Sequence, residues 1–272
     1  MCVARRGHES RWHHRARTIL MVDPLTLAVT ALCVFIISFT KGAFGGGFAI
    51  IGIPLLALVM DPLVAGAFLA PLFCVGDVVA LRYWRPSTWS RPDLQILVPS
   101  QVVGMGIGFL MLNIANRSFF AVAIALITLL FTAHWFTGGR TVVEHPRSLG
   151  KGIAAGAASG VTSMVAHAGG PPVAMYLLPL GLPKTVYAGT TYLFFVVSNF
   201  AKVGPWLVLA TPTLELWWLM ALSVPVIVVG VWVGWRLHQR LDQRRMYSAC
   251  YALLVVVALK LLWDGLKGYG LL

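Results

Sequence analysis

The chain has 272 residues, of which 58% are hydrophobic and 11% are charged, and its mean hydropathy is +0.82. A soluble domain is usually about a quarter charged, so this composition excludes a protein whose whole surface faces water. The formal net charge of +12 would suggest nucleic acid in a soluble chain. Here the Lys and Arg residues lie between apolar segments, which indicates membrane topology and a lipid bilayer as partner, with no nucleic acid.

The first twenty residues carry five Arg and lack the apolar core of a signal peptide. Met21 then opens an apolar stretch and offers a start of its own. We expect residues 1–20 to be a misassigned extension, with a short basic cytoplasmic tail as the alternative.

Six apolar runs are long enough to span a bilayer as helices, for which roughly 20 apolar residues suffice. They cover residues 64–81, 94–112, 118–138, 185–210, 214–235 and 246–263. Helices satisfy their own backbone hydrogen bonds in lipid, and no stretch alternates with the period of a membrane strand. The sequence therefore predicts an all-α polytopic membrane protein.

An internal repeat relates the two halves of the chain. A shift of 122 residues aligns 64–84 with 186–206 and pairs Asp77 with Asn199, and a shift of 126 aligns 102–108 with 228–234. The common order predicts a duplication. We expect a first membrane repeat at 21–139, a cytoplasmic linker at 140–151 and a second membrane repeat at 152–266.

Each half contains five helical segments, and the first two are short and meet at a glycine-rich break. The breaks are KGAFGGG at 41–47 and AHAGGPP at 166–172. Glycine and proline interrupt helices, and irregular backbone at membrane depth is tolerated only where it is buried in protein or lines a wet cavity. We expect short broken or re-entrant helices, with the breaks lining a cavity.

Loop charges orient the chain. The basic clusters at 82–91, 140–151 and 236–245 are expected in the cytoplasm, which places the loops at 61–63, 113–117 and 210–215 outside. Each half then crosses the membrane an odd number of times, whether its short pair spans fully or re-enters. This predicts two inverted repeats of five helical segments each, a recurring transporter design, in the inner (plasma) membrane of a bacterium.

The same residues carry a family resemblance. Residues 169–206, with GGPP followed by LGLP, and residues 41–71 resemble the two halves of the TauE/SafE family of sulfite exporters. The resemblance covers nearly all of residues 25–266. It implies duplicated membrane halves and transport of organosulfur compounds or sulfur oxyanions, often coupled to ions. The first half departs somewhat, because Lys41 precedes the glycines and Asp77 stands inside the third segment.

Lys41 and the two glycine breaks are the leading candidates for substrate binding. A charge in the membrane interior costs at least ~2.5–3.5 kcal/mol and normally faces a bundle interior or water. Bare amides at a helix N-terminus bind anions, and we expect such helices to begin near Phe48 and at Pro171. The glycines concerned are Gly45, Gly46, Gly47, Gly169 and Gly170. The alternatives are that the glycines only permit close packing and that Lys41 snorkels.

Asp77 and Lys202 are candidates for proton or ion coupling, with H⁺ or Na⁺ as the coupling ion. An unpaired carboxylate at this depth would be protonated, so Asp77 is a proton carrier, a counter-ion for Lys41 or Lys202, or an interhelical polar clamp. Asn199, at the equivalent position, supplies hydrogen bonds without charge.

His167 directly precedes the second break and is expected to face the same cavity, where a histidine donates to an anion or exchanges protons. The alternative is a histidine bonded to a carbonyl at the unwound turn. Candidate hydroxyl groups for the substrate come from Thr162, Ser163, Thr190 and Thr191, with the alternative that these residues only pack between membrane helices.

The sequence thus predicts a secondary transporter for a small sulfur-containing or organic anion such as sulfite, sulfonate or thiosulfate. An intramembrane hydrolase using Ser163 and His167 is one alternative, but no motif supplies both an oxyanion hole and an oriented base. An accessory membrane subunit is the other. We expect no enzyme, no cofactor and no metal, since the cysteines show no paired spacing. The oligomeric state stays open.

Overall fold

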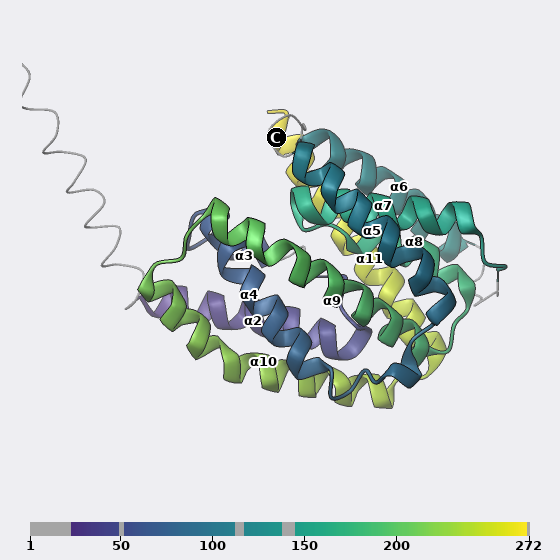
Figure 1. Ribbon diagram of the computed structural model, residues 1–272, viewed down its shortest axis with the longest axis horizontal. Coiled ribbons are helices and arrows are strands. Elements are labelled where there is room, and N and C mark those ends of the chain that lie inside the picture. The colour runs from purple at the N-terminus through teal and green to yellow at the C-terminus, as the bar shows by residue number, and fades with distance from the viewer. Residues whose placement is uncertain (1–22, 49–51, 112–116, 138–144, 271–272) are drawn as a thin grey trace, which may run out of the picture.

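The computed structural model describes residues 23–48, 52–111, 117–137 and 145–270 (Figure 1). In the first half these residues form α2 (Pro24–Phe44), α3 (Gly52–Leu56), α4 (Pro62–Ala80), α5 (Arg91–Met111) and α6 (Arg117–Thr137). The second half contains α7 (Leu149–Ala166), α8 (Gly170–Leu177), α9 (Lys184–Leu209), α10 (Leu214–Arg240) and α11 (Gln243–Gly268). Short 3-10 turns, η2 (Pro86–Thr88) and η3 (Leu178–Leu180), precede α5 and follow α8.

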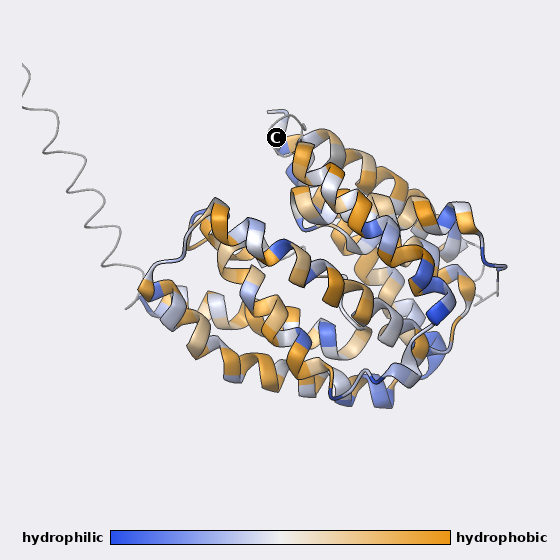
Figure 2. Cartoon of the chain, viewed as in Figure 1, coloured by the Kyte–Doolittle hydropathy of each residue, from blue (hydrophilic) through white to orange (hydrophobic). Residues whose placement is uncertain are grey.

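The described ranges contain helices and no strand, which confirms the all-α membrane fold. By length and composition, α2, α5, α10 and α11 are apolar enough to cross a membrane. The outer surface carries large exposed hydrophobic side chains, among them Leu110 and Val208, as expected of a surface solvated by lipid. Figure 2 shows hydrophobic residues along most helical faces and hydrophilic residues mainly near the helix ends.

Helices pair mainly across the two halves. The first helix of each half packs along the fourth helix of the other, as α2 with α10 and as α7 with α5. The third helices pair with one another, α4 with α9, and so do the fifth, α6 with α11. Exchanging the two halves therefore maps these four pairings onto themselves, as expected of a duplicated chain related by a pseudo-two-fold axis.

Glycine residues allow close backbone contact in the pairs α2–α10 and α5–α7, which the exchange of halves interconverts. A Cβ atom added at Gly42 of α2 would lie 2.1 Å from the carbonyl oxygen of Val231 in α10. The matching pair has the same feature, since a Cβ atom at Gly104 of α5 would lie 2.2 Å from the carbonyl oxygen of Ala157 in α7. Such contacts bring helix backbones close together, which is the usual basis of helix association in membranes.

Several sequence expectations fall wholly or partly outside the described residues. Residues 1–20, expected as a misassigned start or basic tail, lie there entirely, and so does much of the expected linker at 140–151. The repeat boundaries at 21–139 and 152–266 stay predictions. The helix starts differ slightly from those expected: Phe48 is not helical, the next described helix begins at Gly52, and α8 begins at Gly170, one residue before Pro171.

Candidate functional site

The first glycine break ends α2. Gly45, Gly46 and Gly47 have φ values of 80°, 107° and 90°, and Gly45 donates its amide to the carbonyl of Lys41 at 3.1 Å. Three consecutive residues in this region are practicable only for glycine, which has no Cβ atom to clash. At Gly45 a side chain would also meet the carbonyl oxygen of Ala188 in α9 at 1.9 Å.

The second break separates α7 from α8. His167 closes α7 with a φ of 54°, and its amide donates to the carbonyl of Ser163 at 3.2 Å. Side-chain hydroxyls hold the freed carbonyls, since Thr162 donates to Ala168 at 3.2 Å and Ser159 to Gly169 at 2.5 Å. These bonds satisfy backbone groups that water would otherwise have to reach.

The two breaks touch each other. A Cβ atom at Gly170 would lie only 1.7 Å from the carbonyl oxygen of Gly47, so the backbones are in direct contact at this point. A small cavity of about 30 Å³ lies beside this contact, which is room for roughly one or two water molecules. Its polar lining comes from both halves: Thr40, Lys41, Gly46, Gly47, Ser163, His167, Gly170, Asn199 and Lys202.

Lys41 is held by a buried carboxylate. Its ammonium group forms an ion pair with one oxygen of Asp77 and donates to the carbonyl of Phe73 at 3.1 Å. The amide of Asn199 donates to the other carboxylate oxygen at 2.8 Å, and the hydroxyl of Tyr192 donates to the main-chain carbonyl of Asp77 at 2.7 Å. In this structure Asp77 is therefore the counter-ion of Lys41, and its bonds to Asn199 and Tyr192 also link α4 to α9.

Asp77 and Asn199 are also the positions paired by the internal repeat. Their direct hydrogen bond places them where α4 meets α9, the pairing that the exchange of halves maps onto itself. The two halves thus present different chemistry at one symmetric position, a carboxylate from one and an amide from the other.

Lys202 is buried without a carboxylate. It is 4% exposed, and its ammonium group lies 3.5 Å from the hydroxyl of Ser163 and 5.0 Å from the centre of the Phe73 ring. No acidic side chain pairs with it in the part of the chain that the structure describes. The ring face offers some electrostatic compensation, but a hydroxyl and a ring neutralise no charge.

His167 lies between Phe73, at 6.0 Å between ring centres, and Trp206, at 4.5 Å. Both of its ring nitrogens are buried and have no hydrogen-bond partner among the described residues. Its side chain is therefore not bonded to a carbonyl at the turn. Buried donors and acceptors in folded proteins nearly always have hydrogen-bond partners, so the ring nitrogens of His167 are available to a group bound in the cavity.

The remaining sequence candidates lie at the edge of the cavity or away from it. Thr190 accepts the amide of Ser90 at 2.8 Å and so anchors the segment that leads into α5. Gly45 packs on α9, and Gly169 is held by Ser159, without lining the cavity. The sequence did not single out Phe73 or Tyr192, because an aromatic residue in an apolar helix carries no signal of its neighbours.

The pair needed by a hydrolase is not formed. The hydroxyl of Ser163 lies 3.0 Å from that of Ser198, and the ring nitrogens of His167 bond to no described residue. A nucleophile without a hydrogen-bonded base is not activated.

Comparison with known proteins agrees with the resemblance noted in the sequence. A family model described as sulfite exporter TauE/SafE matches residues 30–261. Neither the curated proteins nor the solved structures gave a match. The family match spans both glycine breaks and every residue of the cavity, and it makes the chain a multi-pass membrane protein of a transporter family. The chain belongs to the TauE/SafE sulfite exporter family.

Proposed function

We propose that this protein is a secondary transporter of the bacterial inner membrane and that a small sulfur-containing anion, such as sulfite, sulfonate or thiosulfate, binds in the cavity between the two breaks. The observation that carries the proposal is Lys202, a buried ammonium group that lines the cavity without a carboxylate. An isolated charge at this depth is costly, and a bound anion supplies the missing counter-charge.

Groups around Lys202 suit the oxygens of an oxyanion. His167 presents ring nitrogens without partners, and Ser163 lies within 3.5 Å of the ammonium group. The amide of Gly170 opens α8, whose N-terminal end favours negative charge, although Pro171 and Pro172 contribute no N–H group. In this arrangement Lys202 is the primary cation for the substrate, whereas the sequence had placed Lys41 in that role.

Lys41 becomes available when Asp77 gains a proton or a coupling cation. In the ion pair, its charge is already neutralised. Protonation of Asp77 removes that neutralisation, so the cavity gains one positive charge and binds the anion more tightly. The anion and the proton, or Na⁺ in its place, are then bound together, which couples their movement without any direct contact between them.

Substrate entry requires the breaks to separate. A cavity for one or two water molecules is too small for thiosulfate, and the Gly47–Gly170 contact closes it. We interpret this closed cavity as an occluded arrangement of the site. Access from either side would follow from movement of the paired helices about the contact between breaks, as in other transporters built from inverted repeats.

The test is transport by the purified protein in proteoliposomes. Labelled sulfite, thiosulfate, sulfoacetate and sulfate are offered in turn, with and without a pH gradient and with Na⁺ or K⁺ outside. We expect saturable movement of at least one of these sulfur anions, faster with the coupling gradient and abolished in Lys202→Met. Absence of movement for all of them under both gradients would contradict the proposal.

A further inference from the structure

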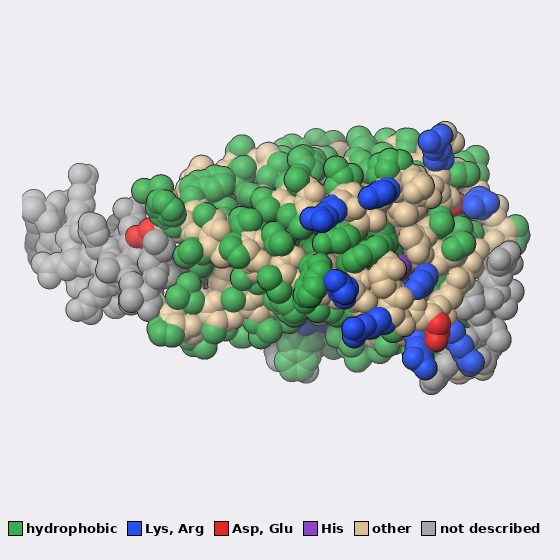
Figure 3. Space-filling view, turned by 90° about the horizontal axis from the view of Figure 1, so that it is seen from below, with side chains coloured by type: hydrophobic (Ala, Val, Ile, Leu, Met, Phe, Trp, Pro, Cys, Tyr) green, Lys and Arg blue, Asp and Glu red, His purple; other side chains and the backbone are tan. Residues whose placement is uncertain are grey.

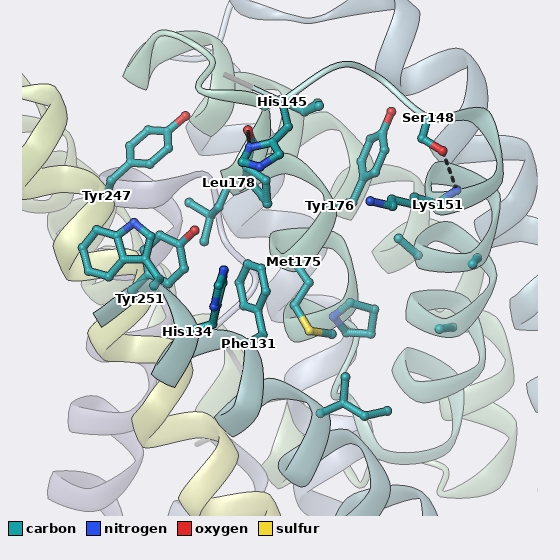
Figure 4. Close-up of a pocket in the computed structure, with 18 of the residues that line it drawn as sticks. Phe131, His134, His145, Ser148, Lys151, Met175, Tyr176, Leu178, Tyr247 and Tyr251 are labelled. Carbon is teal, nitrogen blue, oxygen red and sulfur yellow. Dashed lines mark hydrogen bonds between the residues drawn. The ribbon is translucent and has the colours of Figure 1, made fainter. Parts of the chain in front are cut away.

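A second and much larger pocket lies along α7 and shares no lining residue with the transport cavity (Figure 4). It is a half-open groove of about 780 Å³, within the roughly 300–1,000 Å³ that ligand pockets usually have. Its walls come from α6, α7, α8 and α11, together with the segment that precedes α7.

The groove has a basic end and an apolar end. At the basic end, Lys151 from the first turn of α7 and His145 from the preceding segment lie near Tyr176, whereas His134, from the last turn of α6, lies lower in the view beside Phe131 (Figure 4). Farther along, the walls are aliphatic and aromatic. These residues are Ile124, Ile127, Phe131, Ala154, Ala158 and Met175.

Lys151 is the charge best placed for a ligand. It lies within the first turn of α7, and Figure 4 shows its side chain reaching from that helix toward the middle of the groove. Within the described ranges no carboxylate pairs with it, whereas Arg147 nearby is bound to Asp93 at 3.2 Å. The N-terminal end of α7 adds its own preference for negative charge at the same place.

The groove is distinct from the transport cavity. Ala154, Ala155 and Ala158 of α7 face the groove, whereas Ser163 of the same helix lines the cavity. Helix α8 also contributes to both, since Gly170 lines the cavity and Pro172 lines the groove. No residue belongs to both linings, so a ligand of the groove need not touch the transported anion.

We propose that this groove binds a phospholipid with an anionic headgroup. The phosphate lies by Lys151 and His145, and an acyl chain runs along the apolar wall between α6 and α7. A phospholipid fits on three grounds: a positive charge at one end, hydrocarbon along the rest, and a position on a membrane protein where lipid is the surrounding solvent. A small sulfur anion would leave the long apolar wall uncovered.

The predicted topology agrees with this orientation. The basic end of the groove adjoins the loops that the positive-inside rule assigns to the cytoplasm, and basic pockets between helices on that side are suited to phospholipid headgroups. A Lys side chain near such a headgroup raises the affinity for the anionic lipid about fivefold.

The test measures lipid binding to the full-length protein in detergent by native mass spectrometry. Phosphatidylglycerol is titrated against phosphatidylcholine of the same acyl chains. We expect the parent to prefer phosphatidylglycerol, Lys151→Gln to bind it about fivefold more weakly, and Lys151→Arg to restore binding. Lys267→Gln, which removes an exposed lysine near the end of α11, is the matched control and should bind as the parent does.

A second pair of variants tests the apolar wall. Ala158→Phe, which fills the groove, should lower binding of both lipids, whereas Ile153→Phe, on an exposed position of α7 outside the groove, should not. Equal binding of the two lipids by the parent, or unchanged binding in both Lys151→Gln and Ala158→Phe, would overturn the proposal. So would protection of Lys151 from an amine-reactive label by thiosulfate and not by phosphatidylglycerol, since the groove would then belong to the substrate path.

Discussion

Two buried lysines line one cavity but differ in what compensates their charge. Lys41 has the carboxylate of Asp77 and a carbonyl, and Lys202 has a hydroxyl and a ring face. Removing one partner of a buried ion pair leaves an uncompensated charge and usually costs about 3–5 kcal/mol. Removing a charge that has no partner carries no such penalty. Neutral substitution should therefore lower the stability of the protein at Lys41 but not at Lys202.

For Lys202→Met we expect loss of thiosulfate or sulfite binding without loss of stability, because the variant removes an unpaired ammonium group and keeps an apolar chain of similar length. For Lys41→Met we expect a lower melting temperature, because Asp77 is left without its counter-ion. Thermal unfolding and equilibrium binding of labelled anion by the purified variants measure the two effects. The assignment of Lys202 fails if folded Lys202→Met binds every tested sulfur anion as tightly as the parent.

Asp77→Asn tests the coupling role at the same place. In Asp77→Asn, Lys41 loses its counter-ion, so transport should lose its acceleration by a pH gradient while exchange of anion continues. Tyr192→Phe is the matched control, because it removes a hydrogen bond to the main-chain carbonyl of Asp77 and leaves the carboxylate in place. If Asp77 is only a packing clamp, transport and coupling will instead fall together with stability.

At the scale of elements, the exchanged helix pairs depend on glycine. The atom that would meet a Cβ at Gly42 is a backbone carbonyl of α10, and a backbone cannot move aside as the end of a flexible side chain can. Alanine at this position must push α2 and α10 apart. The same argument applies to Gly104 and α7.

We expect Gly42→Ala to destabilise the protein by roughly 1–3 kcal/mol, the usual cost of overpacking. Gly106→Ala is the control on α5, because a Cβ there meets nothing within 4 Å and alanine favours the helix by up to ~1 kcal/mol. Thermal unfolding followed by size-exclusion chromatography compares the two. A melting temperature for Gly42→Ala equal to that of the parent would mean that the α2–α10 contact is looser than the structure has it.

Hydrophobic runs and glycine breaks predicted the elements well. Both breaks separate a helix from a shorter one, and the six apolar runs begin within a few residues of the starts of α4, α5, α6, α9, α10 and α11. Phe48 itself is not helical, because three successive glycines with positive φ keep the chain out of a helix beyond the end of α2, and a start just after Phe48 falls on residues 49–51, outside the described part of the chain. Composition marks a glycine-rich break but not the dihedral angles that its residues adopt.

The site was predictable only in part. The sequence pointed to Lys41, His167 and the glycines from their place at the breaks, and these residues do line one cavity. Which lysine is neutralised depends on how α2, α4 and α9 pack, since Lys41 and Asp77 are 36 residues apart. No sequence pattern indicated the groove beside Lys151, because its walls come from four helices that meet only in the folded chain.

For the whole molecule, the distribution of charge follows the predicted topology. Exposed arginines lie in the loop between α4 and α5 and around the loop between α10 and α11. Figure 3 shows Lys and Arg side chains gathered toward the end of the molecule that carries the α10–α11 loop, with hydrophobic side chains over the rest of that face. A one-sided distribution of this kind is what the positive-inside rule produces when that end faces the cytoplasm.

The pairing of helices constrains the topology further. The first helix of each half lies along the fourth helix of the other, so the two halves form one interlocked body. Within its own half, the loop at 82–91 follows three helical segments, whereas the loop at 236–245 follows four. If both loops lie on the same side of the membrane, the two halves therefore have opposite orientations.

Single cysteines in a cysteine-free background test this orientation in intact cells. Arg85→Cys and Arg240→Cys, at exposed positions of the two arginine-rich loops, should resist a membrane-impermeant thiol reagent and react after the cells are opened. Thr211→Cys, at an exposed position between α9 and α10, should react from outside without lysis. Native Cys33 and Cys250 are buried and contribute little background even before their removal. Labelling of Arg240→Cys from outside would invert the second half and, with Arg85→Cys protected, would rule out the inverted repeat.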